Sequence, residues 1–198
     1  MNGLILPSSY LYTDRVGRVQ ELLRPLCDGD AIHCTFVPGT RGNSKVISSL
    51  SHQGKTPDNY HDWRFPVRGA PKVWFNYFEI WNLTNNGKEC RLNRAYFHLY
   101  LIDRSAQKLD QIVCVHSDPD EQPLDPNDDK QNRLCLYKRG PHLHILTAGE
   151  LAKCHFPLNL GQIDQVLSTI EDLTKAFADA VEIVRYEIVE IYAGSAAK

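Results

Sequence analysis

The alternation of hydrophobic and polar residues marks a run of β-strands in the middle of the chain. Three segments alternate as strands with one buried face do, at 72–83, 92–103 and 109–117. Asn86-Gly87 lies between the first two segments and tolerates positive φ, which predicts a hairpin turn. Shorter runs predict further strands at 31–38, 133–139, 141–147 and 152–158. Together these segments predict an antiparallel meander sheet of about five or six strands.

The hydrophobic pattern changes to a helical period at both ends of the chain. Apolar residues from Val16 to Leu26 recur every three or four positions behind Thr13 or Asp14, which predicts an N-terminal helix. A similar stripe from Ile163 to Ile188 predicts an amphipathic helix over about 161–191, in one piece or in two with Thr174 as a second cap. Strands followed by a long helix on one sheet face predict an α+β fold.

Length and composition indicate a single domain over 1–198 with two unusual segments. The segment 39–72 is rich in Gly, Ser, Pro and cations, and we expect a long basic loop or insert there. The segment 117–131 is acidic and proline-rich, which predicts an exposed loop. The net charge of -2 predicts no general attraction to nucleic acid or to a membrane.

The chain lacks the sequence features of export or membrane insertion. No run of about 18 or more apolar residues occurs, and the first residues do not form a secretory signal. The six cysteines are scattered without CxxC spacing, so we expect buried free thiols. These features predict a cytoplasmic protein with no membrane partner.

Alternation also sorts the side chains of each predicted strand between the two sheet faces. Apolar rows such as Phe97-Leu99-Leu101 and Val113-Val115 are expected to face the C-terminal helix. The opposite face would then collect His98, Tyr100, Cys114, His116, Tyr137, His142 and His144, with Lys138 and Arg139 at its rim. A β-bulge in any strand would reverse its assignment.

Three chemistries fit this polar face. The first is RNA cleavage without metal or cofactor, since neutral and protonated imidazoles serve as general base and acid near pH 7. Its catalytic candidates are His142, His144, His116, His98 and Tyr137, and its phosphate-binding candidates are Lys138, Arg139, Arg41, Lys45 and Arg64. The second is a metal site in which the CxH at 114–116 and the HxH at 142–144 supply the ligands. In the third, the aromatic and imidazole groups only pack.

Part of the chain resembles a known family. The succession YFHLYLID, KLDQIVCVHSD, LCLYKRGPHLHI, CHFPL and IDQVLSTIEDL, over about residues 94–175, resembles the TumE-like toxins of bacterial toxin-antitoxin operons. The matching positions are Pro141-His142, His144 and His155. The portion before residue 94 and the acidic loop depart from the family pattern. The resemblance implies a bacterial toxin or phage-defence context.

The leading hypothesis is therefore a cytoplasmic, toxin-like ribonuclease. Its expected partners are RNA, a cognate antitoxin or defence-operon protein, and a second copy of the chain. The alternative is a non-catalytic binding or assembly module, because the strand VWFNYFEIW (73–81) holds five aromatic residues. That is more than one half-buried strand needs, so some of these rings are expected at an interface.

Overall fold

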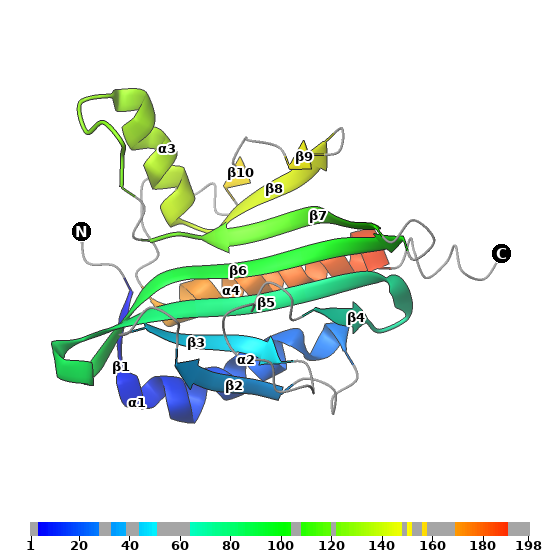
Figure 1. Ribbon diagram of the computed structural model, residues 1–198, viewed down its shortest axis with the longest axis horizontal. Coiled ribbons are helices and arrows are strands. Elements are labelled where there is room, and N and C mark those ends of the chain that lie inside the picture. Colours follow the sequence, from blue (N-terminus) through cyan, green and yellow to red (C-terminus); the bar gives the residue numbers. More distant parts are fainter. Residues whose placement is uncertain are drawn as a thin grey trace.

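The computed structural model describes residues 4–27, 33–38, 44–50, 64–103, 108–119, 122–147, 150–151, 156–157 and 169–189. Its central feature is an antiparallel sheet in which the strands follow one another in the order of the chain (Figure 1). These strands are β2 (His33–Pro38), β3 (Ser44–Leu50), β5 (Ala70–Thr84), β6 (Glu89–Asp103), β7 (Lys108–Ser117), β8 (His142–Thr147) and β10 (Phe156–Pro157). Three short strands join them: β1 (Ile5–Pro7) on β6, β4 (Phe65–Val67) on β5 and β9 (Glu150–Leu151) on β8.

Two helical segments cover the same face of the sheet, behind it in Figure 1. The N-terminal segment runs from α1 (Ser8–Tyr10) through a π-helical turn into α2 (Val16–Leu23) and ends in a 3-10 turn at Leu26. The C-terminal segment is α4 (Ile170–Ile183), which continues as a π-helical turn to Val189. The predicted α+β fold, with a meander sheet and a helix from each end of the chain, is confirmed.

The core lies between this face and the helices, as the alternation predicted. Phe97, Leu99, Val113 and Val115 belong to one buried cluster with side chains of α2 and α4. The ring of Tyr77 packs edge-on against Phe177 of α4, with centroids 5.4 Å apart. Burying such rows is the main stabilising contribution to a two-layer fold.

A buried ion pair joins the N-terminal helical segment to the sheet. Arg15 and Glu79 are both fully buried and form a salt bridge in which Arg15 Nε donates to both carboxylate oxygens, at 3.0 and 3.1 Å. Trp81 Nε1 donates to the same carboxylate at 2.9 Å. Arg15 Nη1 also donates to Thr174 Oγ1 of α4 at 2.6 Å. Burial alone would lower the pKa of Arg15, but Glu79 more than offsets this and raises it.

The predicted strand at 133–139 is wrong, because these residues form the second half of helix α3 (Asp129–Arg139). Asp128 caps this helix by accepting hydrogen bonds from the backbone N–H groups of Lys130 and Gln131. Asp129 lies in the first turn and Lys138 and Arg139 in the last, which suits the helix dipole. Tyr137 is consequently a helix residue and not a member of a sheet strand.

Smaller differences concern the ends of elements and the two unusual segments. The N-terminal helical segment begins at Ser8, before the predicted caps. Thr169 caps α4, and Thr174, the candidate cap of a second segment, lies within that helix. Residues 161–168 and 190–191 of the predicted helix lie outside the described residues. The segment 39–72 is not a continuous loop, since it contains β3, β4 and the start of β5. The acidic segment ends where α3 begins at Asp129, and residues 122–130 are exposed apart from Pro123.

The aromatic strand is accounted for within the chain itself. Phe75, Tyr77, Phe78 and Trp81 are fully buried and Trp74 is partly buried. Phe75, Tyr77 and Trp81 face the helices, and Phe78 packs on the opposite face against Tyr96 and His98. These buried rings therefore do not supply an exposed interface. Among the described residues, no helix has the length and apolar character needed to cross a membrane.

Candidate functional site

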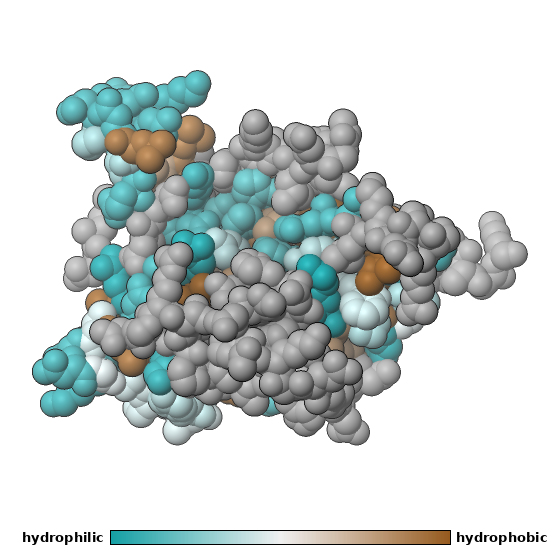
Figure 2. Space-filling view, viewed as in Figure 1, coloured by the Kyte–Doolittle hydropathy of each residue, from teal (hydrophilic) through white to brown (hydrophobic). Residues whose placement is uncertain are grey.

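The sheet face opposite the helices collects histidines from three neighbouring strands. In the antiparallel register, His98 lies opposite Cys114, Cys114 opposite His144, and His116 opposite His142. Directly paired residues project to the same face. A bulge lies between Leu99 and Tyr100, beyond the paired histidines. Figure 2, viewed from this side, shows hydrophilic side chains gathered over the area of β6, β7 and β8.

Three of these residues, His116, His142 and His144, form what we call the histidine centre. The ring centroid of His116 lies 4.7 Å from that of His142 and 4.5 Å from that of His144. One ring nitrogen from each residue can be chosen so that all three atoms lie within 4.8 Å of one another. The Nε2 atoms of all three rings are shielded from solvent. Strands β7 and β8 thus bring three imidazole side chains, each a possible metal ligand, toward one point.

A layer of hydrogen-bonding groups surrounds the centre. His142 Nδ1 lies 2.9 Å from the carbonyl oxygen of Gly140. Because a carbonyl only accepts, this Nδ1 carries the proton, and the lone pair of the neutral ring is on Nε2. The Nδ1 of His116 lies 3.5 Å from Asp118 Oδ2, and Tyr96 Oη donates to Asp118 Oδ1 at 2.8 Å.

The carboxylate of Asp118 is held in its charged form. Burial alone would raise the pKa of Asp118, but its contacts with His116 and Tyr96 outweigh burial and lower it below the ordinary value. Burial and the neighbouring Asp118 raise the pKa of Tyr96, so its hydroxyl remains a donor. The centre therefore has one negative charge directly beside its ligand-type nitrogens.

Cys114 and His98 lie on the same face but outside the histidine centre. Burial, and to a smaller extent Asp118, raises the pKa of the Cys114 thiol well above its ordinary value, so the group is a thiol at neutral pH. His98 is 7% exposed, its ring centroid lies 6.2 Å from that of His116, and its Nδ1 lies 3.0 Å from Tyr100 Oη. The structure brings together the four predicted histidines, with His98 in the outer position.

The predicted cations are distributed unevenly around this face. The guanidinium of Arg64 lies over the ring of Tyr100, at 4.7 Å from its centroid. Arg139 is buried, with Nη2 donating to Gln122, and Lys138 is partly buried in the last turn of α3. Lys45 lies two residues before the core residue Ile47 in β3, so both side chains are on the helix side of the sheet. Arg41 and His155 lie outside the described residues.

Three contributors were missed by the sequence reasoning. The exposed Arg94 lies over the ring of Tyr96, at 5.9 Å from its centroid, and Tyr96 contacts His116 at 4.7 Å between centroids. Alternation along β6 puts Tyr96 on the same face as His98 and Arg94 two residues before it, so the pattern could have identified both as contributors. Asp118 follows His116 by two residues but lies beyond the end of β7, where alternation no longer applies.

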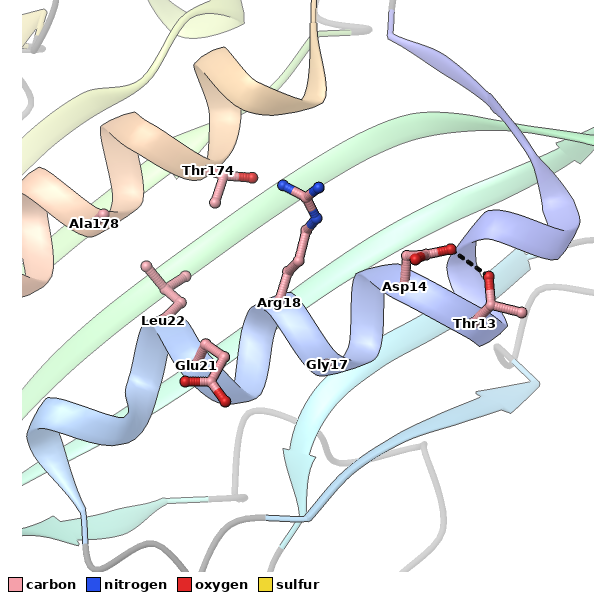
Figure 3. Close-up of a pocket in the computed structure, with 8 residues that line it drawn as sticks. All are labelled: Thr13, Asp14, Gly17, Arg18, Glu21, Leu22, Thr174 and Ala178. Carbon is pink, nitrogen blue, oxygen red and sulfur yellow. Dashed lines mark hydrogen bonds between the residues drawn. The ribbon is translucent and has the colours of Figure 1, made fainter.

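A separate groove of about 530 Å³ lies between α2 and α4, on the helix side of the sheet (Figure 3). Thr13, Asp14, Arg18, Glu21 and Thr174 supply its polar lining, and Thr13 donates to Asp14 at 2.5 Å. The figure shows Arg18 extending from α2 toward Thr174 of α4. Acidic and basic side chains are mixed here, and none of the predicted site residues contributes to the groove.

No protein-family model, curated protein or solved structure matches this chain. The resemblance to TumE-like toxins consequently stays a prediction.

Proposed function

We propose that the histidine centre binds a divalent transition-metal ion, with zinc as the best-fitting ion. The observation that carries this proposal is the convergence of ligand-type nitrogens from His116, His142 and His144 within 4.8 Å. Zinc–nitrogen bonds of about 2.0–2.1 Å in a tetrahedral site put the nitrogens roughly 3.4 Å apart. Side-chain movements on the order of 1 Å would close this set around an ion.

The surrounding hydrogen bonds support the same proposal. Metal-ligating histidines usually donate their second ring N–H to a carboxylate or a backbone carbonyl, which orients the ring. Gly140 supplies such a carbonyl to His142, and Asp118 places a carboxylate beside Nδ1 of His116. In the part of the chain that the structure describes, the buried Nε2 of His116 has no hydrogen-bond partner. A metal ion would satisfy this buried atom.

The three-histidine set favours a catalytic over a purely structural metal site. Structural zinc sites have four protein ligands, whereas catalytic sites keep one position for water or substrate. Zinc lowers the pKa of its bound water to about 7 and so supplies hydroxide at neutral pH. We propose hydrolysis of RNA phosphodiesters as the reaction, since Arg64 and Arg94 place positive charge along this face.

The test is a zinc titration of chelator-treated protein by isothermal titration calorimetry. One ion per chain is expected, and His116→Ala, His142→Ala and His144→Ala should each weaken binding by more than the roughly 10–100-fold typical of second-layer substitutions. His98→Phe on the same face is the matched control and should bind zinc within about threefold of the unchanged protein. Equal binding by the three alanine variants and the unchanged protein would overturn the site.

Metal-independent RNA cleavage is a second proposal, supported by the contact of Asp118 with His116. A carboxylate beside an imidazole orients it as a general base, as in catalytic triads. The two proposals differ in their response to chelator when a fluorescent RNA oligonucleotide is the substrate. Cleavage that stops in chelator and returns with zinc favours the metal site, and cleavage that persists favours acid–base catalysis.

The toxin-like role is tested in cells. Expression of the chain should inhibit bacterial growth, and the double variant His142→Ala/His144→Ala should relieve the inhibition while still folding. Growth inhibition that survives in this variant would contradict both catalytic proposals, because His142 and His144 are metal ligands in the first proposal and acid–base candidates in the second.

A further inference from the structure

The C-terminal end of α3 is attached to the histidine centre by three successive backbone carbonyls. The N–H of Asp118 donates to Lys138 O at 2.8 Å, and Ser117 Oγ donates to Arg139 O at 2.8 Å. The third carbonyl, of Gly140, lies 2.9 Å from His142 Nδ1. Figure 1 shows α3 extending from the sheet near the end of β7. Every one of these three donors is a proposed metal ligand or lies within two residues of one.

We propose that metal binding at the histidine centre fixes α3 against the end of β7, so that α3 transmits the occupancy of the site to the surface. This inference rests on the proposed metal site and adds a regulated element to it. The occupant is a divalent transition-metal ion, and the responding surface is the exposed part of α3 with the acidic loop before it.

The first physical link runs through His142. A metal on Nε2 requires the proton to be on Nδ1, and only an Nδ1–H can donate to the carbonyl of Gly140. An imidazole without metal can carry its proton on either nitrogen. With the proton on Nε2, two acceptors would face each other at 2.9 Å, which disfavours the docked position of the helix end. Metal binding removes this second arrangement.

The second link runs through Asp118. Its backbone N–H donates to the carbonyl oxygen of Lys138, while its carboxylate accepts from Tyr96 and lies beside His116. A metal on Nε2 of His116 polarises the ring and strengthens the interaction of Nδ1–H with the carboxylate. The position of Asp118 therefore depends on whether His116 binds the metal. The hydrogen bond that anchors α3 at Asp118 depends on it in turn.

The third link is electrostatic. The carboxyl end of a helix bears partial negative charge, and it favours a nearby cation. The last turn of α3 points its carbonyls at β7 and β8 beside the centre, so a divalent ion there is attracted to the docked helix more than to an undocked one. By thermodynamic linkage, the factor by which metal binding favours docking of α3 equals the factor by which docking of α3 raises the metal affinity.

Hydrogen-exchange mass spectrometry of the full chain, with zinc and with chelator, tests the coupling. Zinc should slow exchange in peptides covering 132–139 and in peptides containing Asp118, whose amide itself makes the anchoring bond. The expected slowing is about threefold to tenfold, the value of one net hydrogen bond. Zinc binding by calorimetry without a change in these peptides would overturn the coupling and leave the metal site intact.

Two variants make the test reciprocal. Ser117→Ala removes one anchor without touching a ligand, and it should weaken zinc binding by about threefold to tenfold while speeding exchange at 132–139. Asp128→Ala is the matched control, because it removes the cap at the far end of α3 and should leave zinc affinity within twofold. Zinc affinity in Ser117→Ala equal to that of the unchanged protein would overturn the coupling. Failure of the unchanged protein to bind zinc would overturn both the coupling and the proposed site.

Discussion

His116 lies directly opposite His142 in the register of β7 and β8, and their rings stack with centroids 4.7 Å apart. The backbone ladder fixes this separation, so the two side chains are held together before any ligand arrives. A site whose donors are already gathered loses little conformational entropy when it binds an ion. This pre-organisation makes the metal proposal testable through stability as well as through binding.

Zinc should raise the thermal stability of the chain. An ion that binds only the folded state stabilises it by about 2.7 kcal/mol at 100 times its Kd. For a chain of this length that is a rise in Tm of about 5–11 °C. Differential scanning fluorimetry with and without zinc measures the shift. His142→Ala should abolish it, and a shift that persists in this variant would show that the zinc acts elsewhere.

The pair of Arg15 and Glu79 should show strong energetic coupling. Arg15→Met leaves a buried carboxylate without its cation and should lower the free energy of unfolding by about 3–5 kcal/mol. The double variant Arg15→Met/Glu79→Gln keeps an acceptor for Trp81 and should lose less than the sum of the two single variants. Urea unfolding of all four proteins measures the coupling, and strictly additive losses would contradict it.

Thr169 should act as the N-cap of α4. Its hydroxyl accepts from the backbone N–H of Asp172 at 3.1 Å, and the Asp172 carboxylate accepts from the Thr169 N–H at 3.1 Å. Thr169→Ala is expected to cost about 1 kcal/mol in urea unfolding, while Thr169→Ser should cost almost nothing. An equal loss in both variants would mean that the methyl group, and not the hydroxyl, is what matters.

Asp118 should make stability depend on pH in the acid range. Because its folded pKa is lower than the ordinary value of about 3.9, the unfolded chain takes up the proton first as pH falls. Its contribution is fully present above that ordinary value and is lost as pH falls through the folded value. In chelator, the stability gap between the unchanged protein and Asp118→Asn should therefore shrink from pH 6 toward pH 3. A gap that is constant over this range would contradict the lowered pKa.

The gathering of histidines on one face could be predicted because β-strands repeat every two residues. His98, Cys114, His116 and His144 each alternate with apolar neighbours, and the apolar rows must face the helices. The bulge after Leu99 lies beyond His98, so it did not disturb the assignment. Local period and the need to bury apolar side chains were sufficient here.

The segment 133–139 shows where local pattern fails. Leu134 and Leu136 alternate with polar residues over too few positions to separate strand from helix. Asp128, the basic last turn and Gly140-Pro141 were helix signals in the sequence, and they indicate the observed α3. Because of this misassignment, Tyr137 was placed on the sheet. The hydrogen bonds of the carbonyls at the end of α3 with Ser117, Asp118 and His142 could therefore not be predicted.

The sequence by itself therefore determined the strands β5, β6, β7 and β8, the helical segment at each end, and which side chains of these strands share a face, because these follow from short-range periodicity. Only the tertiary structure decided which residues of that face meet. Register set His116 against His142, and the hydrogen bonds of Ser117 and Asp118 to the last carbonyls of α3 placed that helix end against the end of β7. Such contacts depend on strand pairing and on loop paths between distant segments, which no local pattern specifies.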